Sequence, residues 1–479
     1  MKRCSYCGRE NEDDAVHCRE CGTTEFEGSS TAATAPVPGE PVVLQCDRCG
    51  ATTQIAEGFF KERKSFSDSV QTLCPACWRK HKTSIYRDLL LGRLAIGLFG
   101  ILFVYLWPKE PIGWLWLNIF IYDIALSLSI LPHELGHAFT AKWLGWRVFR
   151  IYIGYGKTVL KVKLLGFDTE FRAIPLGGSV LAAPRKIAHY HAKLFAFAIA
   201  GPMANILLMV VLLTAMDGSL AGVQSIAQQL TPLQMFFFAN LLIVIANLWP
   251  RQITTLFGKR PSDGKQLSEA LKMDPDRAVK GHAAGFIWEG ILCQEKKQFI
   301  EAQSWLEKGL KLYPDEIDLL ISSGTNLLSL TRFNEARECF LKALPRTEQD
   351  RLLHSILLNN IAYADALIGS PELLEEADRY SVEAMKNLSW MPSIKGTRGT
   401  VLSELGKLDE AVPLLREVML THEVPHNRAQ NACLLAIAEA RRGNLEAGWK
   451  YLDEARKLDS NCFLLERARN FLDGAKART

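Results

Sequence analysis

Four long apolar runs constrain the fold of this 479-residue chain more than any other feature. Each has enough residues, at ~1.5 Å per residue, to cross a hydrocarbon core of ~30 Å as a helix. Buried helices of a soluble protein are the alternative, but four such runs flanked by aromatic residues are typical of a membrane protein. We therefore predict about four membrane spans, at Leu89–Trp107, Trp114–Leu131, Leu194–Met216 and Leu233–Pro250.

The distribution of Lys and Arg predicts how these spans are oriented. The segment Lys142–Lys193 holds ten basic residues and Arg251–Lys265 holds four, whereas the other two connections hold only Lys109. Basic loops face the cytoplasm by the positive-inside rule, and an even number of spans then places both termini there. The N-terminal residues lack the apolar stretch of a secretory signal, which agrees with this orientation. We predict a multi-pass integral membrane protein with both termini cytoplasmic.

Eight of the twelve cysteines form four CxxC pairs before residue 80. Cytoplasmic thiols stay reduced, so such pairs favour metal binding over disulfides. Two sets of four thiolates suit two structural zinc ions, and four copies argue against the alternative of a redox CxxC. We predict a zinc ribbon at 1–28 with Cys4, Cys7, Cys18 and Cys21, a Ser/Thr/Ala/Pro-rich linker at 29–41, and a second ribbon at 42–82 with Cys46, Cys49, Cys74 and Cys77.

The sequence His133-Glu-Leu-Gly-His137 stands where the second apolar run ends. On a helix, positions i and i+4 share a face, so both imidazoles can bind one zinc ion with Glu134 beside them. Zinc lowers the pKa of water towards ~7, and Glu134 can take a proton from that water and pass it to a leaving amine. A polar helix end held by hydrogen bonds is the alternative, but these groups are costly at the edge of hydrocarbon unless they are paired or bind a metal. The motif therefore indicates a catalytic zinc site.

Residues from about 85 to 270 resemble the site-2 protease family of intramembrane zinc metalloproteases. The family's first motif is matched by His133-Glu-Leu-Gly-His137, and its second by Asn247-Leu-Trp-Pro250 followed by Pro261-Ser-Asp263-Gly264. The resemblance implies that Asp263 is the third zinc ligand, although Asn247 and Asp263 stand farther apart than in the family's compact form. Catalytic zinc takes three protein ligands and keeps one open position, which agrees. An Asp-Gly turn in a linker is the alternative.

Two further stretches match this family. Gly201-Pro-Met-Ala-Asn205 interrupts the third span, and the resemblance implies that Asn205 and Asn247 line the active site. Either asparagine could equally hold helices together. Alternating apolar and polar residues predict strands at Val159–Leu164 and Phe167–Ile174, which the resemblance places as a hairpin with a Gly-Gly turn beside the active site. Such an edge could hold a substrate in extended form, or the hairpin could simply be solvated.

A small residue after an acidic one recurs in the last third of the chain. A period near 34 with a small residue where paired helices touch resembles tetratricopeptide repeats. Such arrays form a concave surface that commonly holds peptides or partner proteins. We predict an α-solenoid at 282–479 that binds a cytoplasmic protein or peptide, with a helical domain lacking any partner as the alternative. The recurring pairs are Glu301-Ala302, Glu335-Ala336, Glu376-Ala377, Glu410-Ala411 and Glu446-Ala447, spaced by 34, 41, 34 and 36 residues.

Together these features predict a mainly α-helical protein: a polytopic membrane core at 85–270 with a small β-hairpin, N-terminal zinc ribbons and a C-terminal α-solenoid. The predicted function is hydrolysis of membrane proteins, in or near their transmembrane segments, by a bilayer-embedded metalloprotease with one catalytic and two structural zinc ions. The alternative is a non-catalytic membrane scaffold, which would not need a complete zinc shell. A formal net charge of +4 and ribbons without a dense basic patch argue against nucleic acid as a partner.

Overall fold

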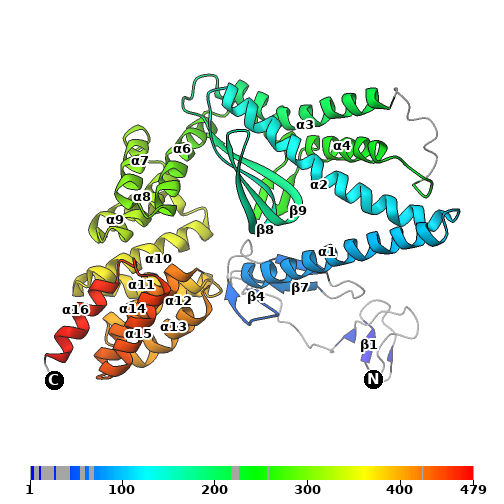
Figure 1. Ribbon diagram of the computed structural model, residues 1–479. Coiled ribbons are helices and arrows are strands. Elements are labelled where there is room, and N and C mark those ends of the chain that lie inside the picture. The colour runs from blue at the N-terminus through cyan, green and yellow to red at the C-terminus, as the bar shows by residue number, and fades with distance from the viewer. Residues whose placement is uncertain are drawn as a thin grey trace.

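The computed structural model describes residues 2–4, 10–11, 26–27, 44–53, 60–63, 70–216, 226–255, 258–422 and 424–477. Helices dominate these residues, and one long hairpin is the main β structure (Figure 1). The predicted linker at 29–41 and the side chains of Cys4, Cys7, Cys18 and Cys21 lie outside the described part. The strands before the first helix are β1 (Lys2–Cys4), β2 (Glu10–Asn11), β3 (Phe26–Glu27), β4 (Leu44–Gln45), β5 (Thr52–Thr53), β6 (Phe60–Arg63) and β7 (Val70–Leu73).

Four apolar helices follow: α1 (Pro75–Leu106), α2 (Pro111–Trp143), α3 (Tyr190–Ala215) and α4 (Pro232–Leu248). Helices α2 and α3 are long and apolar enough to cross a membrane. The apolar part of α1, Leu90–Leu106, and the whole of α4 are shorter. Large apolar side chains on these helices face outward, as Leu98 and Leu207 do with 70% and 67% of their surface exposed. A bilayer would cover such a surface.

The second helix continues well beyond its apolar run, as expected from the motif that follows it. It ends at Trp143, so His133, Glu134 and His137 all lie on its last turns. Helix α3 runs beside this end of α2 (Figure 1). A Cβ atom on Gly136 would stand 2.6 Å from the carbonyl oxygen of Ala200, so a glycine is needed where the two helices touch.

The hairpin of β8 (Arg147–Leu164) and β9 (Phe167–Ala183) joins α2 to α3. The strands predicted from alternation are confirmed, but each is longer than predicted. The turn that joins β8 to β9 is formed by Leu165 and Gly166, which have φ of 50° and 87°, and the Gly-Gly pair is not part of it. Gly177 instead lies inside β9 with φ of 88°. Ile153 pairs with Gly178 on one side and with Phe171 on the other. The residues between these two on β9 form a bulge that carries the strand from one side of β8 to the other, with the Gly-Gly pair at its end.

A small second hairpin explains the long separation between Asn247 and Asp263. Strands β10 (Gln252–Thr255) and β11 (Gly258–Pro261) pair with each other after α4, and α5 (Asp263–Leu271) follows at once. The N–H of Ser262 donates to Arg251 O at 2.9 Å, and its hydroxyl donates to Trp249 O at 2.7 Å. The extra residues are therefore looped out, and Asp263 returns to the end of α4.

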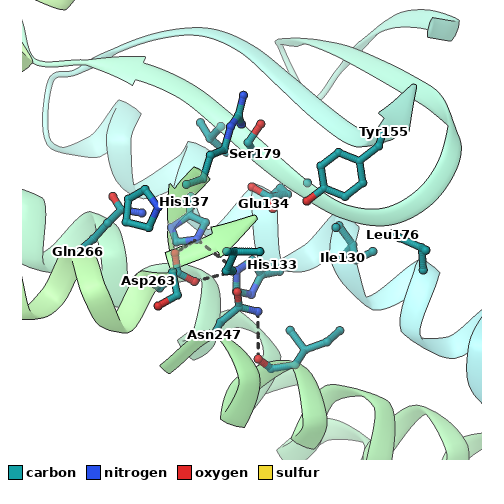
Figure 2. Close-up of a pocket in the computed structure, with 18 of the residues that line it drawn as sticks. Ile130, His133, Glu134, His137, Tyr155, Leu176, Ser179, Asn247, Asp263 and Gln266 are labelled. Atoms are coloured by element: carbon teal, nitrogen blue, oxygen red, sulfur yellow. Dashed lines mark hydrogen bonds and ion pairs between the residues drawn. The ribbon is translucent and has the colours of Figure 1, made fainter. Parts of the chain in front are cut away.

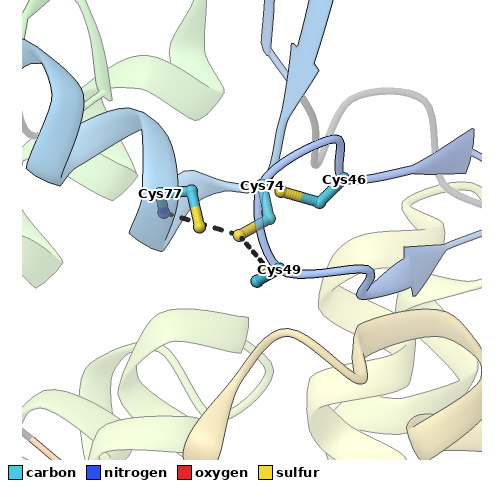
Figure 3. A group of neighbouring side chains, drawn as sticks. All are labelled: Cys46, Cys49, Cys74 and Cys77. Carbon is cyan, nitrogen blue, oxygen red and sulfur yellow. Dashed lines mark hydrogen bonds between the residues drawn. The ribbon is translucent and has the colours of Figure 1, made fainter.

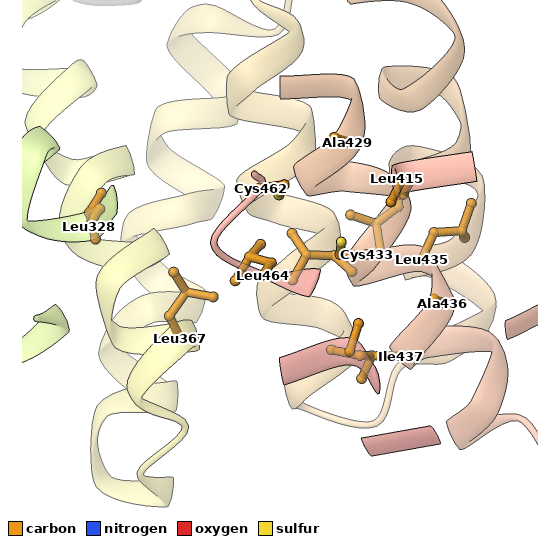
Figure 4. Close-up of a cluster of buried hydrophobic side chains, with 14 of the residues drawn as sticks. Leu328, Leu367, Leu415, Ala429, Cys433, Leu435, Ala436, Ile437, Cys462 and Leu464 are labelled. Carbon is orange, nitrogen blue, oxygen red and sulfur yellow. The ribbon is translucent and has the colours of Figure 1, made fainter. Parts of the chain in front are cut away.

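The rest of the chain forms pairs of antiparallel helices. Its apolar core is shown in Figure 4, and Ala302, Ala336, Ala377 and Ala411 are fully buried. The helices are α6 (Pro275–Glu295), α7 (Phe299–Leu312), α8 (Ile317–Ser329), α9 (Phe333–Ala343), α10 (Arg351–Ile368), α11 (Pro371–Leu388), α12 (Pro392–Glu404), α13 (Leu408–Thr421), α14 (Pro425–Arg441), α15 (Leu445–Leu458) and α16 (Leu465–Lys476).

Two details of the repeat pattern differ from the sequence interpretation. In the last pair the buried small residue is Gly448, and Ala447 is only half-buried. A Cβ atom on Gly448 would stand 3.1 Å from Ala436 O, so Gly448 is the contact between α14 and α15. The spacing of 41 arises because a 3₁₀ turn, η2 (Leu344–Thr347), and longer helices are inserted at that point.

Polar contacts connect the three regions. Arg150 on β8 forms two hydrogen bonds with Glu295 at the end of α6, at 2.8 and 3.2 Å. The hydroxyl of Ser389, next to the end of α11, donates to Thr52 O at 2.8 Å and accepts from Thr52 N at 3.2 Å. The solenoid therefore touches both the long hairpin and the second cysteine-rich unit.

Candidate metal centre and active site

Three side chains from two distant segments converge at one buried point (Figure 2). His133 Nε2 lies 3.1 Å from Asp263 Oδ2 and 3.3 Å from His137 Nε2, and His137 Nε2 lies 3.5 Å from Asp263 Oδ1. All three residues have at most 7% of their surface exposed. Helix α2 supplies both imidazoles, and the looped-out hairpin β10–β11 allows α5 to supply the carboxylate.

The hydrogen bond on the far side of His137 fixes which nitrogen faces this point. His137 Nδ1 lies 2.7 Å from Phe197 O, and a carbonyl oxygen can only accept, so Nδ1 carries the hydrogen. The lone pair of Nε2 then points at Asp263 and His133. Two imidazole nitrogens and a carboxylate this close repel one another unless a cation lies between them. Two His and one Asp, with room for a fourth ligand, fit a catalytic zinc ion.

The carboxylate of Asp263 is held ionised, as a metal ligand must be. Burial opposes ionisation, but the close approach of His133 and His137 outweighs it and lowers the pKa of Asp263 to about 2. Asp263 is also the first residue of α5, where the helix N-terminus favours negative charge. The local fold therefore supplies an anion where the ligand set needs one.

Gly201 on α3 makes room for the ion. A Cβ atom there would stand 2.3 Å from His137 Nε2 and 2.7 Å from His133 Nε2. Real Cβ atoms essentially never make contacts this short, so only a glycine leaves the space beside the two imidazole nitrogens open for an ion. From the sequence, Gly201 is notable only as part of a Gly-Pro interruption of the third span. Its role in leaving space beside the imidazoles depends on the packing of α3 against α2, which the sequence does not give.

Replacing Gly201 by Ala should therefore empty the metal centre. The added methyl group would occupy space at both Nε2 atoms, so we expect the zinc content to fall by about one equivalent per chain. Elemental analysis of the purified protein measures this loss. Gly92→Ala is the matched control, because Gly92 lies on apolar α1 with nothing within 4 Å of its added Cβ. Wild-type zinc content in Gly201→Ala would contradict the assigned hollow.

Glu134 lies beside the ligands in a cavity of about 460 Å³. The long hairpin forms one wall of this cavity through Tyr155, Leu176 and Ser179 (Figure 2). A Cβ atom on Gly178 would stand 2.7 Å from Glu134 Oε1, so the bulge of β9 brings its backbone directly against the carboxylate. Glu134 is not one of the converging ligands and remains available to act on a molecule in the cavity.

The two asparagines singled out by sequence differ in what they contact. Asn205 Oδ1 lies 2.6 Å from His133 Nδ1, and its amide group also reaches Asn240. Asn247 lines the cavity, while its amide group donates to Ile243 O at 3.0 Å on its own helix. Sequence reasoning missed Asn240, whose signal was an amide inside an apolar helix.

A second candidate metal site lies in the cysteine-rich unit before α1. The sulfur atoms of Cys46, Cys49, Cys74 and Cys77 lie within 4.8 Å of one another (Figure 3). Cys49 Sγ and Cys74 Sγ are 3.7 Å apart, close to the ~3.8 Å that four sulfurs at ~2.3 Å from tetrahedral zinc would show. Burial raises the pKa of the Cys77 thiol to about 11, so a cation is needed to hold the full set as thiolates. This geometry fits one structural zinc ion.

Comparisons with known proteins agree with the core of this site. The family model for peptidase family M50 matches residues 121–225. A regulator of sigma E protease from Haemophilus influenzae is 30% identical over 181 residues, which are 33% of this chain and 38% of that protein. A zinc metalloprotease from Mycobacterium tuberculosis, Rip1, is 31% identical over 61 residues, 13% of this chain and 15% of that protein. The chain thus spans well under half the length of these two relatives.

Solved structures of tetratricopeptide-repeat proteins are also similar to part of the chain. One is a thermophilic repeat protein from Thermus thermophilus, 19% identical with a TM-score of 0.32, which covers 40% of this chain and 98% of the repeat protein. The segment matched by the family model contains the HELGH end of α2 and the whole of α3, which supply two of the three converging ligands and the hollow at Gly201. The chain therefore contains a domain of peptidase family M50, the family of site-2 proteases.

Proposed function

We propose that this protein is a zinc-dependent intramembrane protease that hydrolyses membrane proteins in or near their transmembrane segments. The observation that carries the proposal is the buried convergence of His133, His137 and Asp263 next to Glu134 in one cavity. The M50 domain and the zinc metalloproteases that match it support the same reaction. Because the matches cover only part of those relatives, the activity of the whole chain remains our proposal.

The side chains have separate tasks in this proposal. His133, His137 and Asp263 hold the zinc ion. When bound, zinc supplies Lewis acidity, which makes water a better nucleophile near neutral pH. Glu134 accepts a proton from the attacking water and donates it to the amine that leaves. These four residues have at most 7% of their surface exposed, so bulk water screens them little. Electrostatic interactions of the zinc ion and Glu134 with the substrate are therefore stronger than they would be in water.

The long hairpin is the proposed site where substrate lies in extended form. In the described part of the chain, residues 178–183 of β9 pair with residues 147–153 of β8 only, so the other edge of this part of β9 has no strand partner. Leu176, Gly177 and Gly178 line the cavity at the bulge, and the backbone of Gly178 lies next to Glu134. A peptide that adds to a strand edge is held by main-chain hydrogen bonds. A transmembrane helix would have to unwind to bind there, and unwinding exposes the bond to be cut.

We further propose four spans, with both ends of the chain in the cytoplasm. Helices α1 to α4 would cross the bilayer, and the basic hairpin connection would lie on the cytoplasmic side. The cysteine-rich units and the solenoid then share one compartment with the zinc-binding end of α2. The solenoid is proposed to bind a cytoplasmic protein or peptide, through which access to the cavity could be controlled.

Removing the metal tests the proposed reaction. A purified transmembrane substrate should be cleaved by the wild-type protein in detergent, and a chelator should reduce cleavage to background. Adding back zinc should restore it, whereas Mg²⁺, which prefers octahedral oxygen ligands, should not. Products identified by mass spectrometry locate the cut. A protein that binds zinc only in its cysteine-rich units and cleaves none of several substrates would instead be the scaffold.

A further inference from the structure

A chain of buried hydrogen bonds runs away from the metal centre through three helices. His133 Nδ1 on α2 lies 2.6 Å from Asn205 Oδ1 on α3. Asn205 Nδ2 donates to Asn240 Oδ1 on α4 at 2.6 Å and to Ser129 O at 3.2 Å. Asn240 Nδ2 donates to Ser129 Oγ at 2.9 Å and to Phe236 O at 2.8 Å. Ser129, Asn205 and Asn240 have at most 1% of their surface exposed, so water does not compete for these groups.

The hydrogen bond farthest from the metal centre, between Asn240 and Phe236, fixes the orientation of the Asn240 amide group. The carbonyl of Phe236 can only accept a hydrogen bond, so the group of Asn240 that faces it must be the NH₂. Turning the amide over would place two oxygen atoms against each other in a buried site, at a cost of about 1–3 kcal/mol or more for the unsatisfied groups. Asn240 therefore presents its oxygen to Asn205.

Asn205 is fixed in the same way by two acceptors. Its NH₂ group faces the Asn240 oxygen and the backbone carbonyl of Ser129, and neither of these can donate. Its oxygen therefore faces His133 Nδ1, and that contact is a hydrogen bond only if Nδ1 carries the hydrogen. The lone pair of His133 Nε2 is then directed at Asp263 and His137.

We propose that Asn240 and Ser129 are positioning residues of the metal centre, which act through Asn205 to hold His133 in the tautomer that binds zinc through Nε2. The inference rests on the proposed zinc site and adds to it two residues that do not touch the ion. His137 obtains the same result from one backbone carbonyl, Phe197 O. Among the described residues, His133 Nδ1 contacts the side chain of Asn205 instead of a carbonyl, so its orientation can be changed by a substitution that affects this amide.

The arrangement differs from ordinary contacts between membrane helices. Polar side chains that only hold helices together need to be satisfied, but they need no particular direction. In this network, each amide can be oriented in only one way because its neighbour is either a donor or an acceptor. The carbonyl of Phe236 orients Asn240, Asn240 orients Asn205, and Asn205 orients the metal ligand His133. Such partners of metal-binding histidines typically change metal affinity by about 10- to 100-fold when they are removed.

The test is Asn240→Leu in the full chain, with two measurements. Zinc affinity, from competition with a chelator, should fall by about 10- to 100-fold, because Asn205 loses the nearer of the two acceptors that fix its amide group and keeps only the longer contact with Ser129 O. The ¹⁵N chemical shifts of the His133 ring in the metal-free protein report the tautomer directly. Wild type should show the hydrogen on Nδ1, and Asn240→Leu should show a mixture of both tautomers. Ser129→Ala should have a smaller effect, since Asn240 keeps its bond to Phe236 O.

Asn118→Leu is the matched control. Asn118 is also a buried amide on a membrane helix, and it donates to Ile226 O and Gln228 O away from the metal centre. It should lower thermal stability but leave zinc affinity and the His133 tautomer as in wild type. Equal losses of zinc affinity in both variants, or an unchanged His133 ring in Asn240→Leu, would overturn the inference. A wild-type core that binds no zinc would instead refute the proposed function on which it rests.

Discussion

Replacing Glu134 by Gln should lower the rate of substrate cleavage by about 10²- to 10⁴-fold, which is the usual contribution of a general base. The amide cannot take a proton from water at neutral pH, yet it has nearly the same shape as the carboxylate. It can therefore fill the same space against Gly178, whose backbone approaches Glu134 closely. Because Glu134 is not among the converging ligands, zinc content should stay at the wild-type value.

Single-turnover cleavage and elemental analysis on the same preparation test this expectation together. Glu110→Gln is the matched control, because Glu110 precedes the first residue of the same helix and its side chain makes no capping hydrogen bond there. It should cleave as wild type does. Wild-type rates in Glu134→Gln would show that another group takes the proton, and loss of zinc would show that Glu134 has a role in holding the ion.

The parts of this site that the sequence predicted are those that depend on local geometry. His133 and His137 are one helical turn apart, so a helix alone places both imidazoles on one face. The structure places their Nε2 atoms 3.3 Å apart, in agreement with that spacing. The CxxC pairs of the second cysteine-rich unit and the period of the solenoid are likewise short-range patterns, although the last buried small residue is Gly448 instead of Ala447. The side chains of the first group of cysteines lie outside the described part of the chain.

The parts that sequence reasoning missed depend on which segments meet. Gly201 forms the hollow because α3 passes the two imidazoles, and nothing within α3 indicates that neighbour. The orientation of the Asn240 amide is set by contacts with α2 and α3 and with its own helix, α4. The family resemblance placed the Gly-Gly pair in the turn of the hairpin, whereas the structure has Gly177 inside β9 at the bulge that lines the cavity. Contacts between segments far apart in the sequence produce no periodic pattern of residues from which they could be predicted.

Asp263 stands between these two cases, and its replacement by Ala is the second large effect we expect. The family resemblance pointed to Asp263, while the extra residues after Asn247 left its path open. Pairing of Gln252 with Pro261 closes that path. Without the carboxylate, the two Nε2 lone pairs would share a cation with no anionic partner. Zinc affinity at the membrane core should therefore fall by more than about 100-fold, beyond the range for residues that only support a ligand.

Zinc competition and cleavage assays on Asp263→Ala check this, with Asp276→Ala as the matched control. Both residues are acidic and lie in the first turn of a helix, α5 and α6, so both substitutions remove the same favourable charge at a helix N-terminus. Only Asp263 faces the imidazoles, so only its loss should release zinc. Full zinc occupancy in Asp263→Ala would mean that its contacts with His133 and His137 form only when no metal is present. The third ligand would then have to come from another side chain of the cavity.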